Sequence, residues 1–303
     1  MSASRDAERE STPVRTIAIT GALGFVASHL IPRLIASGAH LITIVRPGRD
    51  ATVLERAGCE VRRADLARAE APAADFSGAD GVVHLAGIAQ AVWLTPALEA
   101  ARVQRAVFVG SAGVYTRLPS RGADAKRAGE ATLRASALGY TILRPSMIYG
   151  TPRDRNLVRL LRWIERCPLV PVPARGRTPQ QPVHVEDLCD AILAALERDA
   201  ARRREYDVAG PAPLTLADLV RESARALGRP AWLVPVPLAP AHRLAVWSRR
   251  LRLPFPVSPE QVLRLTESKA VDIGPARRDL DFRPRTFASG ISEEVRVFRG
   301  TRS

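Results

Sequence analysis

Lysine, cysteine and long apolar runs are all scarce in this chain of 303 residues. The three cysteines, Cys59, Cys167 and Cys189, are odd in number and widely separated, which excludes a disulfide framework and a paired metal-binding motif. No stretch reaches the roughly 18 consecutive apolar residues of a membrane-spanning helix. The first dozen residues are polar and charged, unlike a signal peptide. We therefore expect a cytoplasmic protein with no metal site and no membrane span.

Basic residues outnumber acidic ones, and the excess is almost entirely arginine. The formal net charge is +14, and Lys126 and Lys269 are the only lysines among 45 basic residues. This bias indicates a general preference for arginine rather than a designed basic face. No helix-turn-helix, stacking platform or zinc-finger spacing accompanies it, so we expect no nucleic-acid partner. The positive field favours a small-molecule, anionic substrate, and we expect a monomer or homodimer.

A glycine-rich turn follows the first apolar run, Ile17–Ile19, and leads into a helical pattern. Strand, glycine turn and helix form the setting of a dinucleotide-binding fingerprint, although an ordinary turn is the alternative. Gly21 permits the tight turn, and Gly24 lets the backbone approach a pyrophosphate. The helix that follows offers unpaired N–H groups to that anion. The residues predicted to contact the cofactor here are Gly21, Leu23, Gly24 and Phe25.

Arg46 directly follows the second expected strand, Leu41–Val45. In proteins that prefer NAD, an acidic residue at the end of this strand holds the ribose hydroxyls, whereas an arginine pairs with the 2′-phosphate of NADP. One more surface arginine is the alternative interpretation. We predict NADP as the cofactor, with NAD less favoured.

Strands and helices alternate along the first half of the chain. Further strands are expected at residues 60–63, 81–87, 106–109 and 140–143. Helices are expected over residues 51–58 and 124–138. A further helix is expected from Thr95-Pro96 onward, because a hydroxyl cap followed by proline is a typical helix start. This alternation predicts an α/β fold with a doubly wound parallel sheet and a ligand at the carboxyl ends of its strands.

Composition changes after residue 150, where prolines become frequent and mark loops. We predict an NAD(P)-binding Rossmann domain over residues 14–150 and a smaller substrate lobe over residues 151–303, of which residues 182–210 pack back on the sheet. The segment Val183–Leu188 is expected to open a helix that runs to about Leu196. Another helix is expected over Thr215–Leu227, ending at Gly228. A capping box with proline at the first position predicts another helix from Ser258.

Six short motifs occur in order at the expected strand ends. They are Thr20-Gly21-x-x-Gly24-Phe25, Asp65-Leu66, His84-Leu85-Ala86-Gly87, Gly110-Ser111-Ala112-Gly113-Val114-Tyr115, Arg144-Pro145-Ser146-Met147-Ile148-Tyr149-Gly150 and Val183-His184-Val185-Glu186-Asp187. On these motifs the chain resembles, over roughly residues 14–290, the extended short-chain dehydrogenase/reductase family of NAD-dependent epimerases and dehydratases. It is similar in particular to the atypical branch that includes NmrA-like proteins and an accessory subunit of respiratory complex I.

The resemblance implies a role for several residues. The implied cofactor contacts are Asp65 and Leu66 at the adenine, Ala86 and Gly87 at the adenosine ribose, and Pro145 and Ser146 beside the nicotinamide. Ser111 matches the serine that hydrogen-bonds a substrate carbonyl or hydroxyl. For His184 and Asp187, a capped strand-to-helix turn is the favoured interpretation.

The chain departs from the family pattern at its central catalytic pair. In active members, a tyrosine lies four residues before a lysine that lowers the tyrosine's pKa and holds the nicotinamide ribose. Lys126 matches the lysine, but Gly122 occupies the tyrosine's position. Tyr115 is a weaker candidate for a replacement acid. The catalytic candidates are therefore Ser111, Lys126 and Tyr115.

Three functions stay open at this point. The favoured one is an NADPH-dependent oxidoreductase that works without the tyrosine, with Ser111 or water supplying the proton. The second is a nucleotide-sugar epimerase, dehydratase or reductase, against which the missing tyrosine counts, because those reactions begin by oxidising an alcohol. The third is a non-catalytic NADP(H)-binding sensor or assembly subunit.

Overall fold

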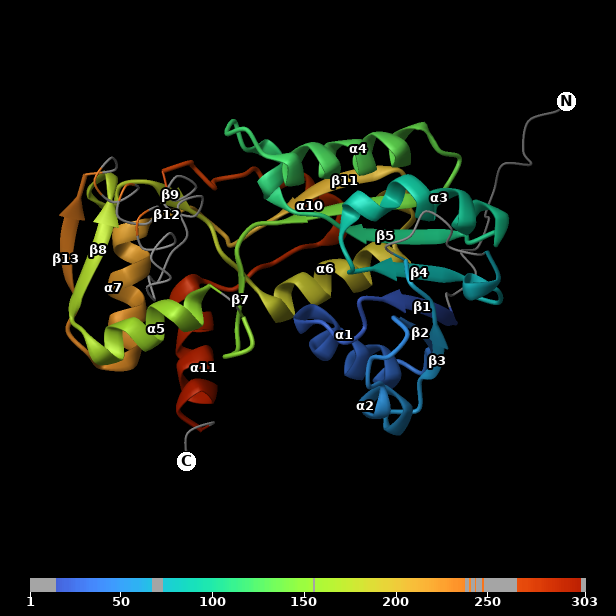
Figure 1. Cartoon of the computed structure of the whole chain (residues 1–303), viewed down its shortest axis with the longest axis horizontal. Helices are drawn as coiled ribbons and strands as arrows, with labels where there is room; N and C mark the ends of the chain where they lie inside the picture. The colour runs from blue at the N-terminus through green and yellow to red at the C-terminus, as the bar shows by residue number, and fades with distance from the viewer. Residues whose placement is uncertain are drawn as a thin grey trace, which may run out of the picture. The chain divides into compact units, whose positions relative to one another are not determined.

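The computed structural model describes residues 15–66, 73–154, 156–237 and 266–300, together with the single positions 240, 243 and 247. Two compact units divide the chain (Figure 1). Unit 1 contains the described residues up to Val109, with Gly129–Ile142 and Ile192–Glu205. Unit 2 contains Gly110–Ala128, Leu143–Ala191 and the described residues from Tyr206 onward. The helix predicted from Ser258 lies outside the described residues, and the domain boundary at residue 150 stays a prediction.

A seven-stranded parallel sheet confirms the predicted fold class. Its order is β11-β6-β5-β4-β1-β2-β3. All pairs among β3, β2, β1, β4 and β5 are parallel. The bounds are β1 Thr16–Thr20, β2 His40–Val45, β3 Glu60–Arg63, β4 Gly81–His84, β5 Arg105–Val109, β6 Tyr140–Pro145 and β11 Arg204–Val208. The chain leaves β1 toward β2 and then returns to β4 on its other side, so the carboxyl ends of β1 and β4 form the crevice in which doubly wound folds bind ligands.

Helices cover both faces of this sheet in unit 1. Figure 1 shows α1 (Phe25–Ala36) and α3 (Ala91–Ala100) on opposite sides of it. The buried face of α3 contributes Leu94 and Leu98 to a core that also holds Val82 and Phe108 from the strands. The short helix α2 (Thr52–Arg56) follows β2 within the predicted range, and α4 (Arg121–Ala135) begins three residues before its predicted start.

The helix start predicted at Thr95-Pro96 is wrong, because both residues lie inside α3. A 3-10 turn at Ile88–Gln90 already leads the chain into this helix, which begins at Ala91. Thr95 is 2% exposed, and its hydroxyl donates to the Ala91 carbonyl at 2.7 Å. The hydroxyl therefore bonds backward within the helix, as buried threonines do, instead of capping its end.

Unit 2 has its own apolar core, formed by α5 (Leu157–Arg166), α7 (Leu216–Leu227) and α11 (Phe287–Gly300). The prediction for α7 is confirmed: Thr215 accepts the Asp218 N–H at 3.0 Å, and Gly228 ends the helix in the left-handed conformation with φ 60°. The remaining elements of this unit are β7 Ile148–Tyr149, β8 Leu169–Pro173, β9 Pro179–Gln180, β10 Val183–His184, β12 Leu214–Thr215, β13 Trp232–Val236 and α10 Gly274–Leu280. Helix α6 (Val185–Glu197) continues directly from β10.

Within the described residues, no helix is long and apolar enough to cross a membrane. The same residues contain no group of three or more histidine, cysteine, aspartate or glutamate side chains arranged to hold a metal ion.

Candidate functional site

The glycine turn after β1 has no room for a side chain. Gly21 has φ 71°, and a Cβ atom there would lie 2.9 Å from both the Ala86 nitrogen and the Leu85 carbonyl carbon. The Gly24 N–H donates to the Gly21 carbonyl at 2.9 Å, and a Cβ on Gly24 would meet that same oxygen at 2.9 Å. The backbone at position 21 is left-handed, and the loop after β4 passes close to it. Only glycine is compatible with both conditions.

The start of α1 is suited to an anion. Gly24 is its N-cap, so no side chain caps the helix, and its first turn contains no acidic residue. The first N–H groups of a helix have no partner within the helix, and they carry the positive end of its dipole. Gly24 itself is exposed. The backbone present here therefore fits the pyrophosphate of a dinucleotide.

Arg46 lies where the prediction places it, immediately after β2 and at the same sheet edge as Gly21. The register pairs Thr20 with Ile44 in β2 and with His84 in β4, so the carboxyl ends of β1, β2 and β4 are adjacent. The Arg46 side chain is exposed and makes no hydrogen bond or ion pair with any described residue. An exposed cationic side chain at this edge can meet an anionic group of a ligand.

The remaining predicted contacts of unit 1 lie at the same edge of the sheet. Asp65 follows β3, whose end pairs Arg63 with Val45 of β2. Leu66 is buried, and its carbonyl accepts the Trp93 indole N–H at 2.6 Å, so its role is to fix this loop. Ala86 is exposed, and Gly87 has φ 123°.

His84 holds the two loops of this edge together. Its Nδ1 lies 2.7 Å from the Thr20 hydroxyl oxygen, and its Nε2 lies 2.9 Å from the Gly87 carbonyl. Burial lowers the pKa of His84 to about 4, so the ring is neutral at physiological pH. Since the Gly87 carbonyl can only accept, Nε2 donates to it and Nδ1 accepts from Thr20. The neutral imidazole thus ties the turn before Gly21 to the turn at Gly87.

Unit 2 brings Ser111 and Lys126 together. Ser111 Oγ accepts the Gly113 N–H at 3.1 Å and caps the 3-10 turn Ala112–Tyr115. A Cβ atom on Gly113 would lie 3.2 Å from Ser111 Oγ and 3.5 Å from Lys126 Nζ. Ser111 Oγ and Lys126 Nζ therefore both lie close to Gly113. Two of the three predicted catalytic candidates are neighbours in the structure.

Gly122 lies in the first turn of α4, four residues before Lys126, and α4 contains no tyrosine. A Cβ atom on Gly122 would meet only the Ser120 hydroxyl, at 3.9 Å. Nothing in the structure thus prevents a side chain at this position. The missing phenol is a property of the sequence and not a consequence of crowding.

Tyr115 is bound in a polar cluster of its own. Its hydroxyl lies 2.9 Å and 3.0 Å from the two carboxylate oxygens of Asp207, and it accepts from the Arg144 guanidinium at 3.2 Å. Partial burial, with the Asp207 carboxylate opposing the effect of Arg144, raises the pKa of Tyr115 to about 12. A phenol held this firmly in its protonated form cannot act as a base near neutral pH.

Ser146 uses its polar groups within unit 2. Its hydroxyl donates to the Gln181 carbonyl, and its N–H donates to the Val208 carbonyl. Pro145 is the last residue of β6 and is buried. These contacts fix the end of β6, and the predicted position of both residues beside the nicotinamide stays a prediction.

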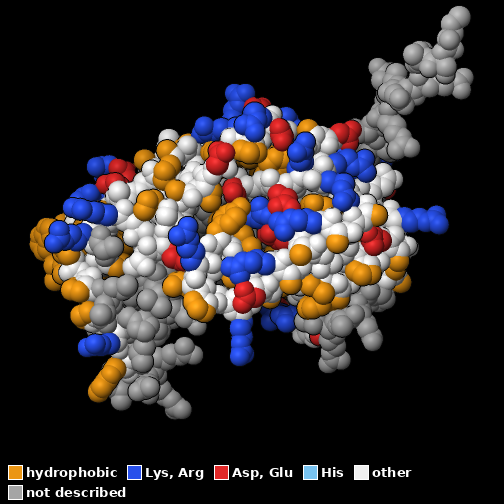
Figure 2. Space-filling model, turned by 90° about the horizontal axis from the view of Figure 1, so that it is seen from above, with side chains coloured by type: hydrophobic (Ala, Val, Ile, Leu, Met, Phe, Trp, Pro, Cys, Tyr) orange, Lys and Arg blue, Asp and Glu red, His pale blue; other side chains and the backbone are white. Residues whose placement is uncertain are grey.

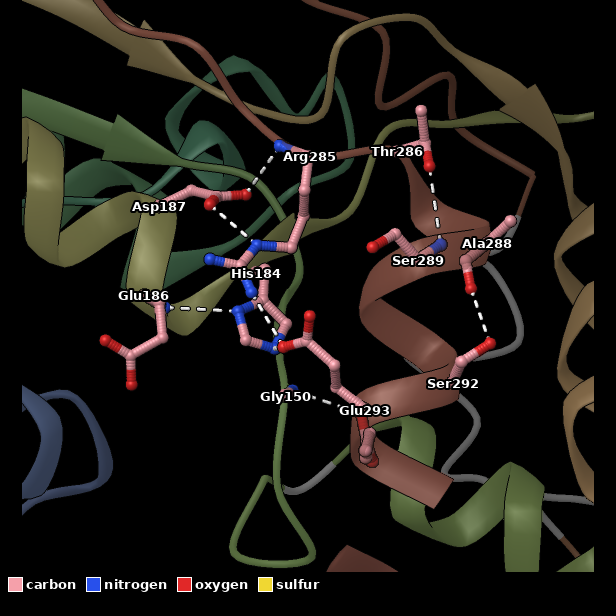
Figure 3. Close-up of polar contacts among 11 residues, drawn as sticks. Gly150, His184, Glu186, Asp187, Arg285, Thr286, Ala288, Ser289, Ser292 and Glu293 are labelled. Atoms are coloured by element: carbon pink, nitrogen blue, oxygen red, sulfur yellow. Dashed lines mark hydrogen bonds and ion pairs between the residues drawn. The ribbon is translucent and has the colours of Figure 1, made fainter. Parts of the chain in front are cut away.

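His184 and Asp187 belong to a larger polar network (Figure 3). His184 Nδ1 accepts the Glu186 N–H at 3.3 Å at the start of α6, as expected for a capped turn. Asp187 accepts the N–H and the Nε–H of Arg285 at 3.0 and 2.8 Å. Arg285 in turn donates to Glu293 of α11 at 2.7 Å. The network ties the start of α6 to α11 and is structural.

Arg285 and Glu293 were not predicted, and no motif marks them. Glu294, the next residue on α11, is fully buried and accepts the Gly150 N–H at 3.0 Å. Burial and the neighbouring Asp154 together raise the pKa of Glu294 to about 9. Glu294 is therefore protonated at neutral pH.

Comparison with known proteins agrees with this geometry. Residues 21–165 match a family model described as NAD(P)H-binding. A ceramide reductase from Caulobacter vibrioides is 29% identical over 242 residues, which cover 73% of each chain. A mitochondrial NADH dehydrogenase (ubiquinone) 1 alpha subcomplex subunit 9 from Arabidopsis thaliana is 26% identical over 284 residues, covering 84% of this chain and 68% of that protein. A solved nucleoside-diphosphate-sugar epimerase from Pseudomonas aeruginosa shares the fold with a TM-score of 0.75 at 24% identity, covering 94% of this chain and 98% of the epimerase.

The first half of the chain is therefore an NAD(P)-binding domain of Rossmann type. Its ordered strand-end motifs and these reductase and epimerase relatives are consistent with the extended short-chain dehydrogenase/reductase family.

Proposed function

We propose that the protein is an NADPH-dependent oxidoreductase that reduces a carbonyl compound without the family's catalytic tyrosine. Arg46 carries the cofactor preference. It is the residue after β2, it is exposed, and the next residues, Pro47, Gly48 and Arg49, bring no carboxylate to the place where an NAD ribose would be held. A guanidinium in this position supports recognition of a 2′-phosphate.

The chain's own residues have distinct roles in this proposal. The backbone at Gly21 and Gly24 and the first turn of α1 hold the pyrophosphate. Lys126 holds the nicotinamide ribose, and Ser111 hydrogen-bonds the substrate carbonyl oxygen. The bound nicotinamide supplies the hydride. Ser111 Oγ already accepts from Gly113 N, so its own O–H is the group that it can offer to a carbonyl.

The missing tyrosine sets the direction of the proposed reaction. Oxidation of an alcohol requires a base for the hydroxyl proton, and base catalysis typically contributes about 10²–10⁴-fold. Position 122 is glycine, and the Tyr115 phenol is held by Asp207 and Arg144. Reduction of a carbonyl needs only a hydrogen-bond donor at the oxygen and a proton that solvent can replace.

The relatives bear on the alternatives. The relative named as a ceramide reductase supports a reductive reaction. The solved sugar epimerase supports the fold but not its chemistry, because the base for alcohol oxidation is missing here. A non-catalytic NADP(H)-binding protein is the second candidate, favoured by that same missing base and by the respiratory-complex subunit among the relatives. A cytoplasmic location, an anionic substrate and a monomeric or homodimeric state complete the proposal.

Calorimetric titration with NADPH and NADH tests the cofactor assignment. Arg46→Ala should weaken NADPH binding by about 1.5–3 kcal/mol, the range for a hydrogen bond to a charged group, and leave NADH binding unchanged. Arg56→Ala is the matched control, since Arg56 is an exposed arginine of α2 in the same unit. Equal affinity of the native protein for both cofactors would refute the assignment.

A kinetic comparison separates the oxidoreductase from the binding protein. Reduction of a ketone and aldehyde panel with NADPH should exceed oxidation of the corresponding alcohols with NADP⁺ at equal cofactor saturation. Ser111→Ala should lower kcat with little change in NADPH affinity. Tight NADPH binding without any turnover across the panel would favour the non-catalytic candidate.

A further inference from the structure

The two-stranded sheet of β8 and β13 has an apolar outer face. Leu169 pairs with Trp232, and Pro171 pairs with Val234. Between them, Val170 is buried in the core of unit 2. The opposite side chains remain in water: Leu169 is 49%, Trp232 is 61% and Val234 is 40% exposed. A sheet with one face on a core normally carries polar residues on its other face, so this surface has the composition of a contact site.

Arginines border this outer face on two sides. Helix α5 lies beside it, because the Trp163 indole N–H donates to the Leu169 carbonyl at 2.9 Å. Three exposed arginines lie along α5, and another precedes β13. In the part of the chain that the structure describes, none of these four side chains makes a hydrogen bond or an ion pair. They are Arg159, Arg162, Arg166 and Arg229.

The same juxtaposition is visible from above. At the left end of Figure 2, the end that β8 and β13 occupy in Figure 1, hydrophobic side chains lie next to basic ones. Apolar side chains that include an exposed tryptophan, bordered by unpaired arginines, are complementary to an anionic lipid surface. Tryptophan prefers the boundary between acyl chains and headgroups, and arginine is attracted to acidic headgroups.

We propose that the outer face of β8 and β13 docks on an anionic lipid bilayer, with Trp232 and Leu169 entering the headgroup region and the four arginines contacting acidic headgroups. The docking surface is defined by Leu169, Pro171, Trp232 and Val234. It depends on side chains remote in sequence from the predicted catalytic and cofactor residues and stands independently of the proposed reaction. Leucine, proline and valine give no platform for stacking bases, so single-stranded RNA fits the surface less well.

Vesicle sedimentation with the full chain tests this proposal. The vesicles contain phosphatidylcholine alone or phosphatidylcholine with one quarter phosphatidylglycerol. Native protein should sediment with the anionic vesicles and not with the neutral ones, and added salt should weaken binding. The double variant Trp232→Ser, Val234→Ser should bind at least about tenfold more weakly, because it loses most of the apolar contact. Val53→Ser is the control, because Val53 is 67% exposed on α2 of the other unit.

A second pair of variants separates local from general charge effects. Replacing Arg162 and Arg166 with glutamine should weaken binding about fivefold for each arginine lost, whereas replacing Arg56 and Arg102 of unit 1 should not. Three results would overturn the proposal: no binding to anionic vesicles, equal binding by the Trp232→Ser, Val234→Ser variant, or binding to single-stranded RNA that is lost in that variant. Self-association that the same variant abolishes, measured by sedimentation velocity without lipid, would assign the surface to a second copy of the chain instead.

Discussion

Replacing Gly21 with alanine tests whether the turn after β1 and the loop after β4 approach as closely as the structure shows. Two costs act on this variant. An L-residue in the left-handed conformation costs about 1–2 kcal/mol, and the φ of 71° lies in that region. The new methyl group would also lie 2.9 Å from the Ala86 nitrogen and the Leu85 carbonyl carbon. Both atoms belong to the backbone, so no side-chain rotation relieves the contact.

Displacing packed backbone to admit a methyl group costs about 1–3 kcal/mol. The Gly21→Ala variant should therefore lose about 2–5 kcal/mol of unfolding free energy. Gly38→Ala is the matched control, because Gly38 has φ 83° and a Cβ atom there would meet nothing within 4 Å. It should lose only the conformational part, about 1–2 kcal/mol. The difference between the two losses of unfolding free energy measures the cost of the close backbone contact separately from the cost of the left-handed conformation.

Urea unfolding of both variants, followed by circular dichroism, measures the two losses. The same samples should then be heated with and without NADPH, since a cofactor that binds only the folded state raises Tm by mass action. We expect Gly38→Ala to keep the cofactor-dependent rise in Tm and Gly21→Ala to lose most of it. Equal losses of stability in the two variants, or an unchanged rise in Tm for Gly21→Ala, would refute the reasoning.

Three further predictions follow from the sites described above. Gly122→Tyr should raise alcohol oxidation with NADP⁺ by at least about tenfold, as expected for a restored base, whereas Gly122→Phe should not; equal rates for the two variants would exclude a positioned phenol. Stability should fall by up to about 3 kcal/mol as pH drops from 6.5 through 4, because folded His84 resists protonation, and urea unfolding of His84→Gln should show a flatter acid dependence. Stability should also fall as pH rises from 4.5 through about 9, because folded Glu294 keeps a proton that the unfolded chain releases, and Glu294→Gln should remove that alkaline loss.

Local patterns were sufficient to predict most of the secondary structure. Residues 60–63 form β3 as predicted, and Thr215 and Gly228 cap α7 as expected from their intrinsic preferences. Thr95-Pro96 misled the prediction because a buried threonine can satisfy its hydroxyl inside a helix as well as at its end. A Thr-Pro pair looks the same in the sequence whether it begins a helix or lies inside one. Only its burial in the folded protein distinguishes the two cases.

Site residues that follow directly after a strand could be predicted from the sequence. Contacts between residues far apart in the sequence could not. Gly21 and Arg46 follow from their position after a strand. The contact of His84 with Thr20 joins residues 64 apart in sequence, and the contact of Arg285 with Asp187 joins residues 98 apart. No local pattern encodes such pairs, because either partner alone is an ordinary polar residue.

The roles proposed for Ser111 and Lys126 are compatible with a function that does not use the tyrosine. Ser111 Oγ and Lys126 Nζ both lie within 3.5 Å of where a Cβ atom on Gly113 would stand. In the proposal the Ser111 hydroxyl donates to the substrate carbonyl oxygen and the Lys126 ammonium holds the ribose, and neither group is an effective base for an alcohol proton near neutral pH. The family arrangement works in both directions because its phenol can gain or lose a proton. Without such a phenol, the proposed site favours reduction, which agrees with the proposed preference for NADPH.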